Sequence, residues 1–248
     1  MSSPRMCVET TINLVLSFCF ILLVVLIIFS YTQFAMNDLF SNPLAFIFYS
    51  LSLVIAITIH EFAHAYTADR LGDPTPKLQG RLTLNPLAHL DPLGTIMLFL
   101  VHFGWGKPVQ FDPFNLRNPR RDAAIISLAG PVSNVTLAVL CSLSLRLFPL
   151  ISPMFSVLIG FLQTLIVINV ILAVFNLVPI HPLDGFKIVG GFLSPQQAKE
   201  WYSLERYGMI FLLFLLFPLF TSTAPISLII SPVINFLLNF LLPNTPLI

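Results

Sequence analysis

The chain has 248 residues, of which 56% are hydrophobic and only 9% are charged, whereas a soluble domain carries roughly 25% charged residues. This composition excludes an ordinary water-soluble globule and predicts a membrane protein. The formal net charge of +1 excludes the strongly basic surface that nucleic-acid binding requires, so we expect no nucleic-acid partner.

Apolar segments long enough to cross a bilayer recur along the chain. We expect a first transmembrane helix at residues 12–29, retained rather than cleaved as a signal peptide, because no small-residue cleavage site follows it. A second is predicted at residues 43–71, followed by Gly72 and Pro74, which are typical of a helix C-terminus. The remaining spans are predicted at residues 123–148 and 154–178, with weaker candidates at 208–220 and 226–242.

Between the second and third spans the chain is mostly polar. Residues 93–103 form an apolar run that is too short to cross a membrane and suits a re-entrant segment. The following stretch, residues 103–111, contains Gly104, Gly106 and Pro108 and is predicted to offer an exposed strand edge. An ordinary surface loop is the alternative for this stretch.

These segments predict an all-α polytopic membrane protein with about five to six transmembrane helices. A re-entrant segment or a short β-hairpin is expected near the cytoplasmic face. No internal repeat or linker is apparent, so we expect a single domain over residues 1–248. Its motif-bearing core lies at about 43–193 and its C-terminal helices at about 207–242.

The basic residues predict the orientation in the bilayer. If Arg5 is cytoplasmic, 11 of the 12 Lys and Arg residues lie on the cytoplasmic side and only Arg146 lies opposite. By the positive-inside rule both termini are then cytoplasmic. The cluster of Arg117, Arg120 and Arg121 is interpreted as a topology anchor near the lipid headgroups. Since no targeting peptide or accessory domain is apparent, a prokaryotic plasma membrane is the expected location.

The second predicted span contains the sequence His60-Glu61-Phe62-Ala63-His64. Two histidines at positions i and i+4 lie on one face of a helix, where both imidazoles can bind one Zn2+. The intervening glutamate can act on a water at the metal. As the alternative, the three polar side chains could simply form hydrogen bonds inside a helix bundle. However, ionisable residues inside a membrane are costly and usually functional.

A catalytic zinc site needs a third protein ligand. Asp69 lies nine residues after His60 and therefore points to the opposite side of the helix. Asp184 is the only Asp, Glu, Lys or Arg between residues 147 and 186, which makes it the leading third ligand, although it also suits the start of a following helix. Rival ligands are His181, His89, Asp91 and His102.

The motif His60 to His64, together with Leu183-Asp184-Gly185, resembles the site-2 protease family of intramembrane zinc metalloproteases in its compact form, without a PDZ or CBS domain. The resemblance covers about residues 50–190. It departs from the family at His181, where a proline is expected. Its further motifs begin at Gly80 (GRLTLNP), His89 (HLDPLG), Gly104 (GWGKPV), Asn118 (NPRR) and Gly130 (GPVSN).

The resemblance implies that His60, His64 and Asp184 bind one zinc ion per chain and that Glu61 is the catalytic acid and base. It also implies that the substrate is the transmembrane segment of another membrane protein. Extra donors for the transition state are then expected among asparagines of the spans, with Asn134 and Asn176 preferred to Asn169. Each of the three could instead be a hydrogen-bonding contact between helices.

The main alternative is a membrane protein that binds zinc without cleaving peptides, such as a metal carrier or a pseudoprotease. Glu61 argues against it, because a carrier needs ligands but no general base between them. A purely structural membrane scaffold is a third hypothesis.

Overall fold

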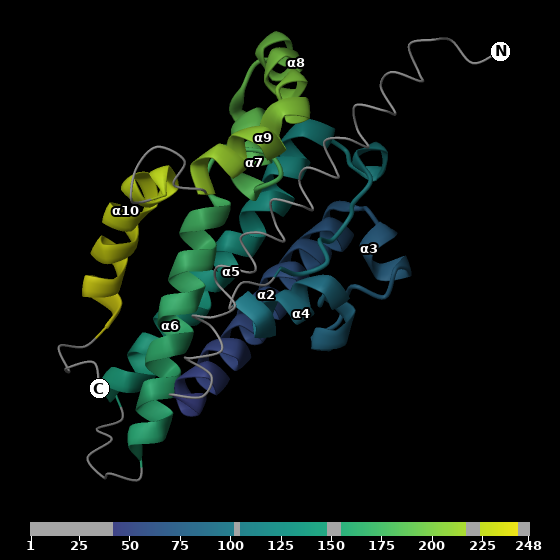
Figure 1. Cartoon of the computed structure of the whole chain (residues 1–248). Helices are drawn as coiled ribbons and strands as arrows, with labels where there is room; N and C mark the ends of the chain where they lie inside the picture. The colour runs from purple at the N-terminus through teal and green to yellow at the C-terminus, as the bar shows by residue number, and fades with distance from the viewer. Residues whose placement is uncertain (1–41, 102–104, 148–154, 217–223, 243–248) are drawn as a thin grey trace. The chain divides into compact units, whose positions relative to one another are not determined.

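The computed structural model describes residues 42–101, 105–147, 155–216 and 224–242. They form helices and short connections (Figure 1). The helices are α2 (Pro43–Leu71), α3 (Thr75–Leu78), α4 (Pro92–Val101), α5 (Pro119–Leu147), α6 (Ser156–Asn176), α7 (Asp184–Phe192), α8 (Pro195–Ser203), α9 (Glu205–Leu216) and α10 (Pro225–Leu241), with two 3-10 turns, η1 (Pro86–Ala88) and η2 (Pro113–Asn115).

Within the described ranges the chain divides into two compact units, residues 42–46 with 92–101 and 105, and residues 47–91 with 106–147, 155–216 and 224–242. In the first unit the structure describes the start of α2, the helix α4 and Trp105. The backbone of Trp105 lies against Gly94 of α4 so closely that a Cβ at this glycine would collide with it. Every described residue considered as a metal ligand belongs to the second unit.

The core of the second unit lies between α5, α6 and α10 (Figure 1). The buried side chains of this cluster are apolar and come from all three helices. They are Ala138, Cys141, Leu165, Ile166, Val170, Val174 and Leu241. The hydroxyl of Ser142 donates a hydrogen bond to the carbonyl of Leu241, which fixes the end of α10 to α5.

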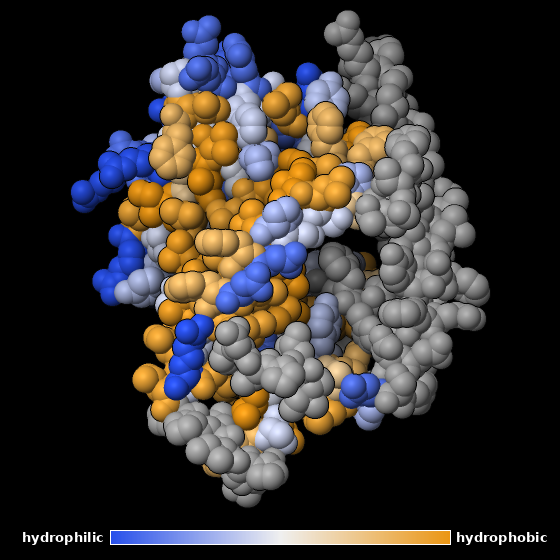
Figure 2. All heavy atoms as spheres, turned by 90° about the vertical axis from the view of Figure 1, so that its left-hand side faces the viewer, coloured by the Kyte–Doolittle hydropathy of each residue, from blue (hydrophilic) through white to orange (hydrophobic). Residues whose placement is uncertain are grey.

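Figure 2 shows that apolar side chains cover much of the face on which α10 lies. The exposed apolar side chains of α10 include Leu228, Ile229, Phe236 and Phe240. Apolar side chains exposed in this way are typical of a surface that contacts a membrane or another protein.

Three of the described helices, α2, α5 and α6, are long and apolar enough to cross a membrane. They correspond to the spans predicted at residues 43–71, 123–148 and 154–178. The helices α9 and α10 form where weaker spans were predicted, but they contain only 12 and 17 residues. Residues 12–29 lie outside the part of the chain that is described, so a total of five to six spans stays a prediction.

The predicted β-hairpin is not confirmed, because the described ranges contain no β-strand and only a single antiparallel bridge, between Leu90 and Gly106. The amide of Lys107 donates to the carbonyl of His89 at 2.7 Å, and this hydrogen bond is one of those that form the bridge. Residues 92–101 of the predicted re-entrant segment form α4. That this segment enters the membrane without crossing it stays a prediction.

The connection after α2 is built around Asp73. Gly72 has a φ of +106°, which an L side chain rarely adopts, and it turns the chain out of the helix. The buried Asp73 carboxylate accepts hydrogen bonds from the Thr75 amide (3.0 Å) and hydroxyl (2.6 Å), the Asn115 side chain (2.8 Å) and the Asp112 amide (2.7 Å). Burial alone would raise the pKa of Asp73, but these hydrogen bonds hold that pKa below its ordinary value. Asp73 thereby attaches residues 112–115 to the end of α2.

Candidate metal centre

The two histidines of the motif lie one turn apart on α2. The centres of their rings are 4.6 Å apart and the ring planes are nearly perpendicular. Both residues are buried, with 5% of His60 and 7% of His64 exposed. The i, i+4 spacing therefore brings the two imidazoles together as the helix period predicts.

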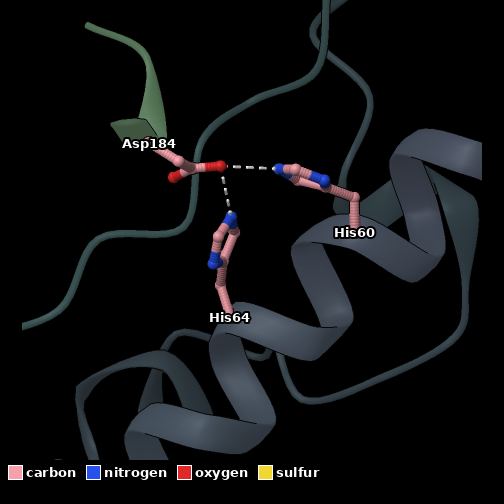
Figure 3. Close-up of side chains that lie close together, drawn as sticks. All are labelled: His60, His64 and Asp184. Atoms are coloured by element: carbon pink, nitrogen blue, oxygen red, sulfur yellow. Dashed lines mark hydrogen bonds and ion pairs between the residues drawn. The ribbon is translucent and has the colours of Figure 1, made fainter. Parts of the chain in front are cut away.

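Asp184 reaches these imidazoles from a distant part of the chain (Figure 3). Its Oδ2 atom lies 3.1 Å from Nε2 of His60 and 3.3 Å from Nε2 of His64. Asp184 is the first residue of α7. Gly185 follows it, and a Cβ there would collide with the carbonyls of Leu177 and Val178. The glycine therefore lets the chain fold tightly after α6 and places Asp184 over α2.

Each imidazole is oriented by a hydrogen bond at its other nitrogen. Nδ1 of His64 lies 2.7 Å from the carbonyl oxygen of Ile126. Because a carbonyl can only accept, this Nδ1 carries the proton. In a neutral His64 ring, Nε2 then presents a lone pair toward Asp184.

Asn134 orients His60 in the same way. Its Oδ1 lies 2.5 Å from Nδ1 of His60, while its amide nitrogen donates to the Ala56 carbonyl (3.1 Å) and to Oδ1 of Asn169 (2.8 Å). Both amide hydrogens of Asn134 are thus used, so Oδ1 must accept from His60 and Nε2 of that ring also presents a lone pair. Hydrogen bonds of this kind typically fix the tautomer of metal-binding histidines.

Three electron-pair donors therefore converge without a hydrogen between them when the rings are neutral. Such an arrangement is repulsive unless a cation lies among the donors. Two imidazoles and a carboxylate are ligand types that zinc prefers, and ligands about 2.0 Å from a tetrahedral zinc lie about 3.3 Å from each other. The measured separations of 3.1 and 3.3 Å agree with that spacing.

Gly130 of α5 leaves space beside the nitrogens. A Cβ at this position would lie 2.5 Å from Nε2 of His64 and 2.6 Å from Nε2 of His60. Any other residue would therefore place a carbon where a metal ion must approach. In the described part of the chain, His60, His64 and Asp184 are the group of histidine, cysteine and acidic residues whose ligand atoms lie close enough together, within 4.8 Å, to hold one ion.

Glu61 follows His60 directly on the same turn of α2. The amide of Val109 donates a 2.7 Å hydrogen bond to its Oε2. This contact joins the motif to the segment after Gly106, which the sequence predicts as an exposed strand edge. The structure therefore places that segment against the glutamate of the motif.

The remaining predicted residues lie elsewhere in the described structure or outside it. Nδ1 of His181 lies 3.6 Å from the Glu205 carboxylate, and Nε2 of the buried His89 lies 2.7 Å from the Thr83 carbonyl. Asn176 donates to the carbonyl of Leu172 on its own helix at 2.9 Å. Neither Asp91 nor any of these three residues joins the three-donor group, and His102 is not among the described residues.

Sequence reasoning assigned no role to Gly130 or to the carbonyl of Ile126. Gly130 stands in one of the quoted motifs, which was the available signal, but only the tertiary approach of α5 to α2 shows what the missing side chain does. A backbone carbonyl such as that of Ile126 leaves no sequence signal.

A family model and several named relatives of this chain both point to zinc metalloproteases. The family model described as Peptidase family M50 matches residues 150–217, which include Asp184. The protein named "Putative zinc metalloprotease YwhC" of Bacillus subtilis (strain 168) is 39% identical over 170 residues, which cover 66% of this chain and 78% of the relative.

Mycobacterial relatives are more distant. "Putative zinc metalloprotease Rip2" of Mycobacterium tuberculosis (strain H37Rv) is 34% identical over 168 residues, covering 65% of this chain and 63% of the relative. The protein of the same name from Mycolicibacterium smegmatis is 34% identical over 173 residues, covering 66% and 64%. The matched region thus spans slightly less than two thirds of the Rip2 proteins. No solved structure matches the chain.

Proposed function

Because the chain belongs to peptidase family M50, the site-2 protease family, we propose that it is a membrane zinc endopeptidase that cleaves peptide bonds within or near the transmembrane segments of other membrane proteins. The observation that carries this proposal is the convergence of His60, His64 and Asp184 beside Glu61 on a helix long and apolar enough to span a membrane. The names of the relatives support the zinc-dependent chemistry.

His60, His64 and Asp184 would hold the metal, with one zinc ion per chain. Bound zinc would supply a Lewis acid that polarises a peptide carbonyl and makes water more acidic. Asn134 and the Ile126 carbonyl keep the two Nε2 atoms available by holding the protons at Nδ1. We therefore assign Asn134 to orienting His60, because its amide hydrogens bond to Ala56 and Asn169.

Glu61 would act as the general base and acid. Its carboxylate takes a proton from the attacking water and returns a proton to the leaving nitrogen of the peptide. The Val109 amide engages Oε2. The second carboxylate oxygen, Oε1, is the atom that we assign to proton transfer.

The substrate must expose its backbone before it can be cleaved. In a helix each peptide bond is engaged in the hydrogen bonds between residues i and i−4, so the cleaved stretch has to unwind. Gln110 is exposed, and its backbone forms no hydrogen bond with the described part of the chain. We assign the segment around Gln110 to pairing with an unwound substrate strand.

The enzyme would work in a bilayer, with the three long helices spanning it and the polar connections on one side. From the distribution of basic residues we assign those connections, and both termini, to the cytoplasmic side of a prokaryotic plasma membrane. The site would then lie within the membrane, toward its cytoplasmic face.

A single substitution separates proteolysis from metal binding. Glu61→Gln keeps the shape of the side chain but removes the base, so we expect cleavage to fall by about 10²- to 10⁴-fold while the zinc content stays that of the wild type. The assay uses proteoliposomes that contain a single-pass protein with a Gly-Pro pair in its span, and products are identified by mass spectrometry. Glu200→Gln, the same change at an exposed position of α8, is the control and should cleave normally.

Two results would contradict the proposal. Cleavage by Glu61→Gln at the wild-type rate would exclude Glu61 as the base. Zinc binding by the wild type without any Glu61-dependent cleavage would favour the alternative, a zinc-binding membrane protein that is not a protease.

A further inference from the structure

Arg81 is a buried arginine that the mechanism above does not use. Only 5% of the residue is exposed. Within the described ranges it forms no salt bridge with a carboxylate, since every ion pair there involves a histidine. A buried guanidinium needs strong compensation, because transferring a charge out of water is costly.

The compensation comes from two consecutive backbone carbonyls. The Nη2 group of Arg81 donates to the carbonyl of Lys107 and, at 3.0 Å, to the carbonyl of Pro108. Burial lowers the pKa of Arg81, and the negative charge of Glu61 opposes that shift, so the two side chains interact electrostatically. Arginine nevertheless stays protonated in proteins. Arg81 is therefore a permanent cation held against the backbone of residues 107–108.

The Pro108 carbonyl and the Val109 amide belong to one planar peptide group. Arg81 binds the oxygen of this group, and Oε2 of Glu61 accepts from its nitrogen at 2.7 Å. A rigid peptide plane thus connects the guanidinium to the carboxylate. A charge-assisted bond at the oxygen also strengthens the amide as a donor.

We propose that Arg81 is a positioning residue for Glu61, which it orients through the peptide group between Pro108 and Val109. The proposal rests on the proposed function, because the role of Glu61 as a base belongs to that function. Without Arg81 the peptide group can rotate, and the carboxylate loses the amide that fixes its orientation. We expect the metal ligands to be unaffected, because the hydrogen bonds of Arg81 in the described ranges go to the backbone of residues 107–108.

Hydrogen exchange tests this link without any substrate. We compare the deuterium uptake of a peptide covering residues 107–112 in wild type, Arg81→Met and Glu61→Ala. Each substitution should accelerate exchange of the Val109 amide, with zinc content unchanged. Arg117→Met is the matched control, because Arg117 is exposed and the same change there should leave exchange as in the wild type.

Kinetics tests the consequence for catalysis. Arg81→Met should lower kcat by about 10- to 100-fold, the range expected from a small misplacement of a catalytic group, with KM within about twofold of wild type. Arg81→Lys keeps the charge but not the planar fork, and should give an intermediate kcat. A partial loss of folding would lower the apparent kcat and the zinc content in the same proportion and leave KM unchanged, so kcat is expressed per bound zinc.

A double-mutant cycle tests whether Arg81 acts on Glu61 through the Val109 amide. Val109→Pro removes the amide hydrogen, whereas Val109→Ala keeps it and controls for the lost side chain. If Arg81 acts through this amide, Arg81→Met combined with Val109→Pro should lower kcat no further than the more damaging single change. Independent roles would instead multiply the two losses.

The outcomes separate the inference from the proposed function. Unchanged exchange in Arg81→Met, a wild-type kcat in Arg81→Met or Arg81→Lys, an effect on KM alone, or multiplicative losses in the cycle would each overturn the positioning role. If Arg81→Met fails to fold, a wild-type kcat in zinc-loaded Arg81→Lys overturns it and an intermediate kcat supports it. Absence of any Glu61-dependent cleavage by the wild type would overturn the proposed function itself, and with it the catalytic role of Arg81, whatever the exchange data show.

Discussion

At the scale of single residues, the geometry of the candidate site depends on side chains that would not themselves touch the metal. Gly130 provides space, because a Cβ there would lie within 2.6 Å of both Nε2 atoms. Asn134 and the Ile126 carbonyl orient the two imidazole rings, because they accept hydrogen bonds from the Nδ1 atoms. Two histidines and an aspartate alone do not make a metal site. Gly130, Asn134 and the Ile126 carbonyl determine whether an ion can reach the lone pairs of the two Nε2 atoms.

We predict that Gly130→Ala prevents zinc binding. The new methyl group would occupy the space beside His60 and His64, so bound zinc should fall from about one per chain to a small fraction of that. Elemental analysis of the purified protein measures this directly. Gly160→Ala is the control, because its Cβ would meet only the ring of Phe48, at 3.2 Å, and it should keep its zinc. Full zinc occupancy in Gly130→Ala would contradict the predicted position of the ion.

We predict that Asn134→Leu weakens zinc binding by about 10- to 100-fold, as the loss of a hydrogen-bond partner of a metal-binding histidine typically does. The leucine cannot accept from Nδ1 of His60, so the ring loses its fixed tautomer. Competition with a chelator measures the affinity. Asn176→Leu is a matched change at an asparagine whose hydrogen bond, in the part of the chain that the structure describes, is to Leu172 of its own helix, and it should cost much less. Equal effects of the two changes would exclude the orienting role of Asn134.

At the scale of elements, the end of α2 and the connection after it position the segment that touches Glu61. α2 ends at Leu71, where the sequence predicts its end, because Gly72 takes up a positive φ. Asp73 then accepts from Asp112, three residues beyond Val109. One carboxylate therefore links the helix of the motif to the segment that contacts the glutamate.

We predict that Asp73→Asn destabilises the protein at pH 7, by about 1–3 kcal/mol for a buried hydrogen-bonded group. The folded pKa of Asp73 lies below its ordinary value of 3.8. Its ionised form therefore stabilises the fold above about pH 4, and this contribution is lost as the pH falls through the folded pKa. Thermal unfolding in detergent should show a difference between wild type and Asp73→Asn that shrinks below about pH 4. A difference that does not depend on pH would show that the charge of Asp73 is unimportant.

At the scale of the whole molecule, the long apolar helices were the feature that the sequence predicted best. Uninterrupted apolar runs with clear ends predicted helices that correspond to α2, α5 and α6 to within a few residues. The sequence also singled out His60, His64 and Asp184, which the fold brings together although Asp184 is 124 positions from His60.

Other features could not be predicted because they arise only when distant segments meet. The space beside Gly130, the proton positions on the imidazoles and the Arg81 contact to the backbone leave no periodic or local signal. The expected strand at residues 103–111 is not seen in the described ranges, which hold only a single bridge between Leu90 and Gly106. Pairing of this kind depends on a partner strand, which the proposed function assigns to the substrate.

The most direct test of the central claim is the number of zinc ions per polypeptide in the detergent-purified protein. We predict about one zinc in the wild type and a strong reduction in Asp184→Ala, while Asp91→Ala, which changes a rival ligand outside the three-donor group, keeps its zinc. Folded wild type without zinc, or an Asp184→Ala variant that binds zinc as tightly as the wild type, would contradict the proposed site.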